Sequence, residues 1–493
     1  MKLKKLTALA AAFTLALSGA AFAEDVWDGT IGTVPGSSGG VITITTGEQL
    51  AAFAQSVNNG STYAGQTVRL GDDINLNNHE WTPIGRFFMY GGINGAKNRA
   101  FSGTFDGAGH KITNLKVTNN NGNWDARGET AALFGYIDFP AANAARAKSA
   151  APAISAEAMA QADAAALGLS GEAYDKVVAE RTDFYTAFGV EQPSIQPMSL
   201  TPAQSGGIVK NLKVYGSVTN TRGQGASGIV CWNDGLVENC YFEGTIDIHD
   251  NNTRAYVGGI SSLLGSGAYV VNCAAKVDAQ ANGGNFSYAG GIAGYFYAMG
   301  AGYVVNCSVE PGSIIDSYMD TGGVVGGFAS HVVNCVSAAD EVRVNGQIEN
   351  EAGYYRGAII GAFGTATNCF WLSNSDAQPE ASVGGGSDTS GLRTSLAALP
   401  AGSVLFDAVN ATTGSMATVT PAYYPTGSNS SAVSLSGWTS SDTSVASQLY
   451  DNIFTTNSAG FASVYAVASS SQWNNTAVSE VSVTPETVIT VTQ

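Results

Sequence analysis

Apolar and polar residues alternate with a period of two in short segments spread along most of the chain. The segments follow a recurring asparagine, and the first and third residues after it are mostly apolar, whereas the residues between and beyond are mostly polar in the early copies. This alternation predicts β-strands with one buried face. No helical stripe fits these segments, and glycines interrupt every copy, so each copy should form a few short strands joined by turns.

The segments belong to one repeating unit. From Asn211 onward, the asparagines are separated by 28, 33, 34, 28 and 34 residues. A glycine-rich signature keeps the same rhythm between them, in the forms "SGIVCW", "GGISS", "GGIAGY", "GGVVGG" and "GAIIGA". Stacked repeats of this length and composition favour an all-β fold, a right-handed parallel β-helix in which equivalent residues form columns about 4.8 Å apart.

Two columns of the predicted β-helix are defined by the repeat. An asparagine at the same corner of each coil tolerates a left-handed backbone and passes amide hydrogen bonds along the stack, so we interpret this column as structural. It contains Asn114, Asn211, Asn239, Asn272, Asn306, Asn334 and Asn368. The next residue of each unit should point into the coil, and this inward column contains Leu115, Leu212, Cys240, Cys273, Cys307, Cys335 and Cys369.

The column cysteines are predicted to be buried, reduced thiols. Their Cβ vectors should run parallel, which leaves the Cβ atoms too far apart for a disulfide bridge. Export would favour bridges, so this interpretation goes against the usual compartment rule. The chain has no Cys-x-x-Cys pair, and a metal site or other cofactor is not expected. Whether Cys231 pairs with Cys240 across a corner stays open.

The ends of a β-helix need caps, because they expose unpaired strand edges and an open core. Ile44–Gly60 has helical apolar spacing and a capping-box relation between Thr46 and Gln49, which predicts a helix over the first coil. After a Gly/Ser linker, Thr394–Ala411 is predicted to be a second cap, interrupted by proline.

The rhythm of the repeat breaks between residues 138 and 205. Two Ala-rich segments there are strong helix formers that end in glycine, which predicts a helical insertion. One of them carries Phe184, Tyr185 and Phe188. These aromatic rings either pack the helices onto the solenoid or contact a partner.

The first 23 residues resemble a signal peptide, with Lys2, Lys4 and Lys5 before an apolar run and Ala21-Phe22-Ala23 at its end. Their removal takes away three of the 22 basic residues and none of the 39 acidic ones, so the net charge changes from −17 to −20. Such a charge argues against nucleic acid and anionic membranes as partners. No later stretch is apolar enough for a transmembrane helix. The protein is expected to be exported, to the surface or outside of a bacterial cell or to its periplasm.

The opening "ITTGEQLAAFAQSVNNG", the segment "FSGTFDGAGHKITNLKV" and the Gly-Gly-aliphatic units together resemble secreted bacterial proteins with GLUG-motif repeats. The same opening resembles the region ahead of the zinc peptidases that cleave immunoglobulin A1. Downstream, Trp438 and the stretch Ser440–Ser447 resemble a bacterial Ig-like domain of group 2. Cys231, Ser262 and Ala358 depart from the glycines of the repeat motif. The resemblance implies a surface β-helix followed by a small β-sandwich.

These features divide the chain into six parts. We expect a signal peptide (1–23), a cap with the first coils (24–137), the helical insertion (138–205), the β-helix repeats (206–375), a linker with a C-terminal cap (376–411) and an Ig-like domain (412–493).

The expected function is non-enzymatic binding or display at a bacterial surface, of the kind adhesins perform, with a glycan or an extracellular protein as ligand. None of the four histidines begins a His-Glu-x-x-His motif, and the outward columns next to the asparagines show no acidic cluster for acid–base catalysis. The alternatives are a carbohydrate-active β-helix, a lyase or hydrolase, and a structural component of the cell envelope.

Overall fold

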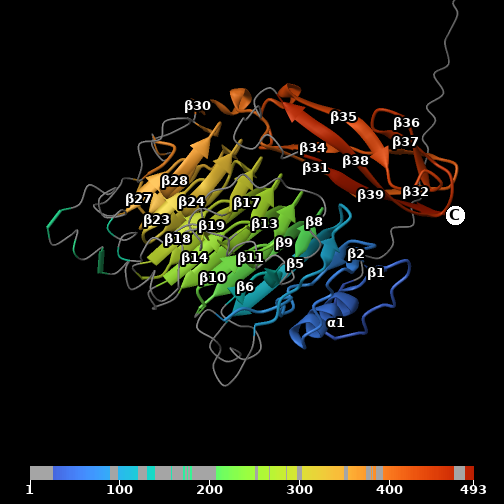
Figure 1. The fold of residues 1–493 in the computed structure, drawn as a ribbon, viewed down its shortest axis with the longest axis horizontal. Helices are drawn as coiled ribbons and strands as arrows, with labels where there is room; N and C mark the ends of the chain where they lie inside the picture. Colours follow the sequence, from blue (N-terminus) through green and yellow to red (C-terminus); the bar gives the residue numbers. More distant parts are fainter. Residues whose placement is uncertain are drawn as a thin grey trace, which may run out of the picture.

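The computed structural model describes residues 26–88, 98–119, 130–138, 207–470 and 483–493, with isolated positions between 157 and 179. Within 207–470, the gaps are 222, 250–253, 266, 285, 297–301, 349–353, 373–378, 380 and 385–391. The predicted signal peptide lies outside the described residues, as does the predicted insertion apart from those isolated positions and Asp138, which ends a strand. Most described elements are short parallel strands stacked into coils (Figure 1). The predicted fold class, an all-β parallel β-helix, is confirmed.

Three parallel sheets form the walls of the β-helix. The 13-stranded sheet contains β1 (Val41–Ile44), β2 (Thr67–Leu70), β4 (Thr104–Asp106), β8 (Ile208–Lys210), β12 (Leu236–Glu238), β16 (Tyr269–Val271), β20 (Tyr303–Val305), β24 (Val325–Val333), β28 (Ile360–Thr367), β19 (Ala293–Phe296), β15 (Ser261–Leu264), β11 (Val230–Asp234) and β7 (Phe134–Asp138). The six-stranded sheet contains β6 (Thr130–Ala131), β10 (Gly225–Ser227), β14 (Arg254–Gly258), β18 (Phe286–Gly290), β23 (Asp320–Gly322) and β27 (Tyr355–Gly357).

The 11-stranded sheet follows the asparagine of each coil. It contains β3 (Ile74–Asn75), β5 (Lys111–Asn119), β9 (Lys213–Asn220), β13 (Tyr241–His249), β17 (Ala274–Asn282), β21 (Ser308–Val309), β22 (Ile314–Ser317), β25 (Val336–Ser337), β26 (Glu341–Val344), β29 (Phe370–Leu372) and β30 (Leu392–Thr394). The strands β9, β13 and β17 of successive coils pair in continuous register, so that Lys213, Tyr241 and Ala274 lie directly opposite one another. Alternate residues of these strands fill a single apolar core that runs the length of the coils.

Helix α1 (Gly47–Asn58) packs onto the first coils. Thr46 is its N-cap, and its hydroxyl accepts a hydrogen bond from the backbone N–H of Gln49. The apolar stripe predicted from the sequence is fully buried at Leu50, Phe53 and Val57. The ring of Phe53 stacks on that of Phe105 in β4, so the helix closes one end of the core.

The segment Thr394–Ala411 does not form the terminal cap that the sequence suggested. β30 adds one more strand to the 11-stranded sheet, and a 3₁₀ turn (Leu396–Ala398) follows. The chain then runs back along the side of the coils, where Leu399 packs against Val336 and Ala338. The proline at position 400 interrupts the segment as expected, but the apolar side chains cover a lateral surface.

The described residues from 401 onward, 401–470 and 483–493, form what we call the C-terminal sandwich. Two sheets share its core, one of β32 (Val409–Thr412), β39 (Glu486–Thr492), β38 (Gly460–Ser470) and β35 (Val433–Ser440), the other of β33 (Met416–Thr418), β37 (Ile453–Thr456) and β36 (Ala446–Tyr450). A two-stranded sheet of β31 (Ser403–Phe406) and β34 (Pro421–Tyr424) adjoins them. The sandwich core includes Ala401 and Val404, so this unit begins before the expected boundary at 412. Figure 1 shows it lying beside the coils, with β31 and β34 next to β13 and β17.

Candidate functional site

Six of the seven predicted asparagines, all except Asn114, occupy one corner of the β-helix, between the 13-stranded and 11-stranded sheets. All seven predicted positions have a left-handed backbone, with φ between 50° and 55°. Four hydrogen bonds join carboxamides of successive coils, from Nδ2 of one asparagine to Oδ1 of the one before. They link Asn239 to Asn211 (3.0 Å), Asn272 to Asn239 (2.7 Å), Asn334 to Asn306 (3.3 Å) and Asn368 to Asn334 (2.7 Å).

Asn114 does not belong to this column, which corrects the sequence alignment. Its amide donates to Asn75, and the pairing of β5 with β9 shifts register between Ile112 and Leu115. The place below Asn211 is taken by Asp106, whose Oδ1 accepts from Asn211 Nδ2 at 3.0 Å. The turn after Asp106 provides the left-handed backbone at this point through Ala108, so the asparagine is not needed there.

The inward column is buried, but its first member is also displaced. Leu115 lies opposite Gly216 rather than Leu212, because of the same register shift. The other members, Leu212, Cys240, Cys273, Cys307, Cys335 and Cys369, are fully buried. Each column cysteine places its sulfur near a carbonyl oxygen of the preceding coil, as Cys307 does with Val270 at 3.6 Å.

All six cysteines are free thiols, including Cys231 and Cys240. Burial raises the pKa of Cys231 to about 12 and that of Cys273 and Cys369 well above the usual value. Cys231, Cys273 and Cys369 are therefore poor nucleophiles. All five column cysteines are fully buried among apolar side chains, which indicates that the column fills the core. The aromatic residues Phe184, Tyr185 and Phe188 lie outside the described residues.

The outward residues nearest the corner are covered by the C-terminal sandwich. Lys213, Tyr241, Ala274, Ser308 and Val336 are all less than a tenth exposed. Leu405 of β31 packs on Tyr241 and Ala274. In the sequence, this outward column becomes less polar in the later coils. That change indicates a covered surface, and the sequence analysis did not predict this interface.

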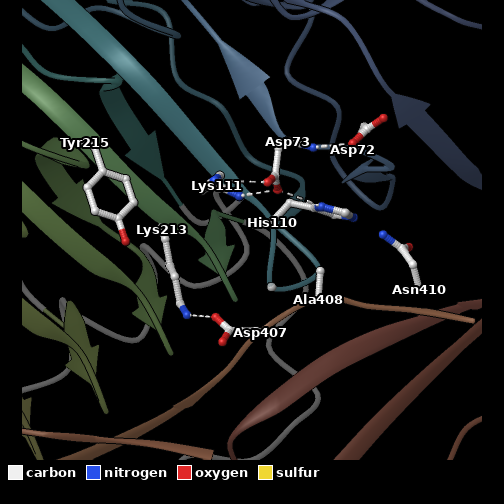
Figure 2. Close-up of a pocket in the computed structure, with 10 residues that line it drawn as sticks. Asp72, Asp73, His110, Lys111, Lys213, Tyr215, Asp407, Ala408 and Asn410 are labelled. Carbon is white, nitrogen blue, oxygen red and sulfur yellow. Dashed lines mark hydrogen bonds and ion pairs between the residues drawn. The ribbon is translucent and has the colours of Figure 1, made fainter. Parts of the chain in front are cut away.

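A pocket of about 300 Å³ lies where the first coils meet the C-terminal sandwich (Figure 2). We call it the junction pocket. Side chains from the coils line one side, and residues that follow β31 line the other. The lining consists of Asp72, Asp73, Gly109, His110, Lys111, Lys213, Tyr215, Asp407, Ala408 and Asn410.

Five of the six ionisable Asp, His and Lys side chains in the junction pocket are paired with one another, and Asp72 is the sixth. Asp73 accepts from the backbone N–H of Lys111 at 3.1 Å and contacts His110 Nδ1 at 3.0 Å, with Lys111 Nζ 3.5 Å away. Burial opposes ionisation of Asp73, but the bonds from His110 and Lys111 outweigh it and lower the pKa of this carboxyl. Lys213 forms an ion pair with Asp407 across the pocket (Figure 2).

Tyr215 supplies a neutral polar group to the same pocket. Burial and the nearby charges of Glu243, Asp407 and Asp73 raise the pKa of its phenol. The hydroxyl therefore stays protonated at neutral pH and can donate a hydrogen bond. With Asn410 and the exposed Asp72, it gives the pocket a set of donors and acceptors suited to a polar, uncharged ligand.

A second group of polar side chains lies at the ends of β7 and β11. Asp138 and Asp234 are directly opposite each other in register, and both are partly buried. Asp234 Oδ2 accepts from Trp232 Nε1 at 3.0 Å and from the hydroxyl of Tyr136 at 3.1 Å. Burial and the charge of Asp138 raise the pKa of Asp234 to about 7, against the effect of its two donors. Paired carboxyl groups on separate coils were not found from the sequence, because they fall in columns remote from the asparagine.

Metal and membrane features are absent from the part of the chain that the structure describes. There, no three histidine, cysteine or acidic residues are placed to hold a metal ion. No helix in the same residues is both long and apolar enough to cross a membrane.

No protein-family model matches this chain, and no curated protein does. Among solved structures, the chain is similar to a protein from Bacteroides ovatus provisionally described as an immunoglobulin A1 protease. The identity is 15%, the TM-score is 0.41, and the similarity covers 74% of this chain and 87% of that one. A similarity of this size says nothing about activity or ligand.

Proposed function

We propose that the protein is an exported, non-enzymatic binding protein of the bacterial surface that holds a polar ligand, such as the end of a glycan, in the junction pocket. The observation that carries the proposal is the charge pairing inside this pocket. Asp73 is held by His110 and Lys111, and Asp407 is held by Lys213. Groups engaged in this way position a ligand but lack the free base or acid that catalysis requires.

The chemical class of the ligand follows from what the pocket leaves unpaired. Paired charges offer little net attraction to an ion, whereas the Tyr215 hydroxyl, the Asn410 amide and the Asp72 carboxylate suit hydroxyl groups. A volume of about 300 Å³ accommodates one or two sugar rings. The GLUG-type and Ig-like resemblances support display at a surface.

A glycan array probed with residues 24–493 tests this function. The double variant Tyr215→Phe with Asn410→Ala should bind the recognised glycans at least about tenfold more weakly, because two hydrogen bonds to the ligand are lost. Thr245→Ala, on the exposed part of the same sheet, is the matched control and should bind normally. Equal binding by the double variant and the control would exclude the junction pocket as the site.

A second candidate function is acid–base chemistry on a polysaccharide at Asp138 and Asp234. The specific observation in its favour is the raised pKa of Asp234, to about 7, beside a second carboxyl group. Two neighbouring carboxyl groups, one of them with a raised pKa, match the roles of acid and base in glycoside cleavage. Turnover on a polysaccharide panel that disappears in both Asp138→Asn and Asp234→Asn would establish this function, and the absence of turnover in the native protein would exclude it for those substrates.

A further inference from the structure

We propose that the asparagine corner is a two-state latch for the C-terminal sandwich. In the docked state, β31 binds the carboxamide of Asn272. In the undocked state, Asn306 donates instead to Asn272 and completes the column. The latch is connected to the proposed function, because the docked sandwich supplies one side of the junction pocket. The effect of the latch on ligand binding rests on the proposed function, whereas the latch itself does not.

The docking contact at Asn272 is bidentate. Its Nδ2 donates to the carbonyl oxygen of Val404 at 2.6 Å, and its Oδ1 accepts from the backbone N–H of the same residue at 2.8 Å. Val404 lies in β31, whose other side pairs with β34. The side chain of Asn272 thus occupies the unpaired edge of β31 and satisfies it as the peptide group of a neighbouring strand would.

This contact interrupts the asparagine column at one place. Asn272 Oδ1 is engaged by Val404, and the donor that would otherwise reach it, Asn306 Nδ2, is buried and has no hydrogen-bond partner among the described residues. Asn306 is only 2% exposed, so water does not readily satisfy it. A buried unpaired donor is unfavourable. Docking therefore costs the column one hydrogen bond, and undocking restores it.

Polar contacts hold much of the remaining interface. Lys210 Nζ lies 2.6 Å from Glu486 Oε2, Asn239 Nδ2 donates to the carbonyl oxygen of Thr484 at 3.1 Å, and Ser308 Oγ donates to that of Tyr424 at 2.9 Å. The apolar contribution near the latch comes from Leu405 on Tyr241 and Ala274. An interface rich in polar contacts resembles those between domains that move relative to one another.

Movement of β31 also moves the wall of the junction pocket. Asp407, Ala408 and Asn410 follow β31 directly in the chain. When the sandwich leaves the corner, the ion pair from Lys213 to Asp407 opens and the pocket loses this side. Latch and ligand binding are therefore coupled, and a ligand that touches both sides stabilises the docked state.

Hydrogen exchange of the peptide containing Ser403–Phe406 tests the latch in the full exported chain without any ligand. Three glycine variants are compared, Asn272→Gly, Asn306→Gly and Asn334→Gly, since glycine tolerates the positive φ that all three positions share. Asn334 is the matched control, because its carboxamide bonds to Asn306 and Asn368 in the column. Circular dichroism confirms that the coils stay folded.

The latch predicts three different results. Exchange in Asn272→Gly should be about tenfold faster, because the docking bonds are lost. In Asn306→Gly it should be about fivefold slower, because the undocked state can no longer gain its hydrogen bond. In Asn334→Gly it should match the native protein.

Two results would overturn the proposal. Unchanged exchange in Asn272→Gly would mean that this side chain does not hold β31, and equal or faster exchange in Asn306→Gly would mean that the two hydrogen bonds do not compete. Because no ligand is present, failure of the glycan-binding test leaves this result unaffected, and the converse also holds.

Discussion

The two ends of the same strands in the 11-stranded sheet meet opposite environments. Near the asparagine corner, the outward residues Tyr241 of β13 and Ala274 of β17 are buried under the C-terminal sandwich. Farther along, Thr245 and Asp278 also point outward, and they are exposed to solvent. One coil geometry therefore carries both a contact surface and a free surface, and the chemistry of the outward residue distinguishes them.

The largest effect is expected from a charge placed inside the coils, which belongs to neither surface. Cys307→Asp would bury a carboxylate without a partner between Cys273 and Cys335, and it should destabilise the protein by about 3–5 kcal/mol or prevent folding. Cys307→Val keeps an apolar side chain and should cost less than about 1.5 kcal/mol. Urea unfolding of the two variants makes the comparison. Similar midpoints would mean that the column is not a dry core.

The next effect separates the covered and free surfaces directly. Ala274→Asp places a charge under Leu405 and should cost about 2–3 kcal/mol of docking free energy, because the charge must be desolvated. Thr245→Asp makes the same charge on the exposed part of the neighbouring strand, where it faces Asp278 in solvent, and it should cost less than about 1 kcal/mol. Limited proteolysis reports release of the C-terminal sandwich. Equal protection of the two variants would show that the surfaces do not differ.

The coils could be predicted from the sequence more completely than the contacts that the rest of the chain makes with them. The asparagine repeat and the alternation after it define strands, register and the inward cysteines, because these depend on neighbours one coil away. The alignment was wrong at Asn114. In that coil, Asp106 accepts the hydrogen bond from Asn211, and Ala108 has the left-handed backbone. A one-residue repeat signature cannot reveal such a replacement.

The candidate sites depend on contacts between distant parts of the chain. Lys213 meets Asp407 in the junction pocket, and Asp138 meets Asp234 across the interval that contains the predicted insertion. Nothing in the local pattern around either aspartate indicates its partner. The outward residues Tyr241 and Ala274 indicated that this surface of the coils is covered. They did not indicate which part of the chain covers it.

A smaller, pH-dependent effect on stability should come from Glu238, a carboxyl group near the covered surface. Burial, Glu486 and Asp106 raise the pKa of Glu238 to about 7 despite Lys210, whereas the usual value is 4.5. A raised pKa means that the unfolded chain loses this proton first, so the contribution of Glu238 to stability is greatest below pH 4.5 and declines as the pH rises towards about 7.

Glu238→Gln removes this dependence. The difference in unfolding free energy between the variant and the native protein should therefore grow in favour of the variant between about pH 4.5 and pH 7, as measured by urea titrations at several pH values. Glu341→Gln, on a partly buried strand remote from Glu486, is the control. A difference that is constant with pH would show that Glu238 titrates normally beneath the sandwich.

The smallest expected effect concerns the asparagine column itself, at Asn334. Asn334 bonds to Asn306 and Asn368, and Asn334→Gly removes both hydrogen bonds while keeping a residue that accepts a φ of 53°. The cost should be about 1–2 kcal/mol, because each hydrogen bond between neutral groups contributes about 1 kcal/mol. Asn334→Ala adds backbone strain and should be less stable than the glycine variant by roughly 1 kcal/mol. If alanine were as stable as glycine in thermal unfolding, the left-handed backbone would not be what selects asparagine at this corner, and the hydrogen bonds along the column would have to account for it alone.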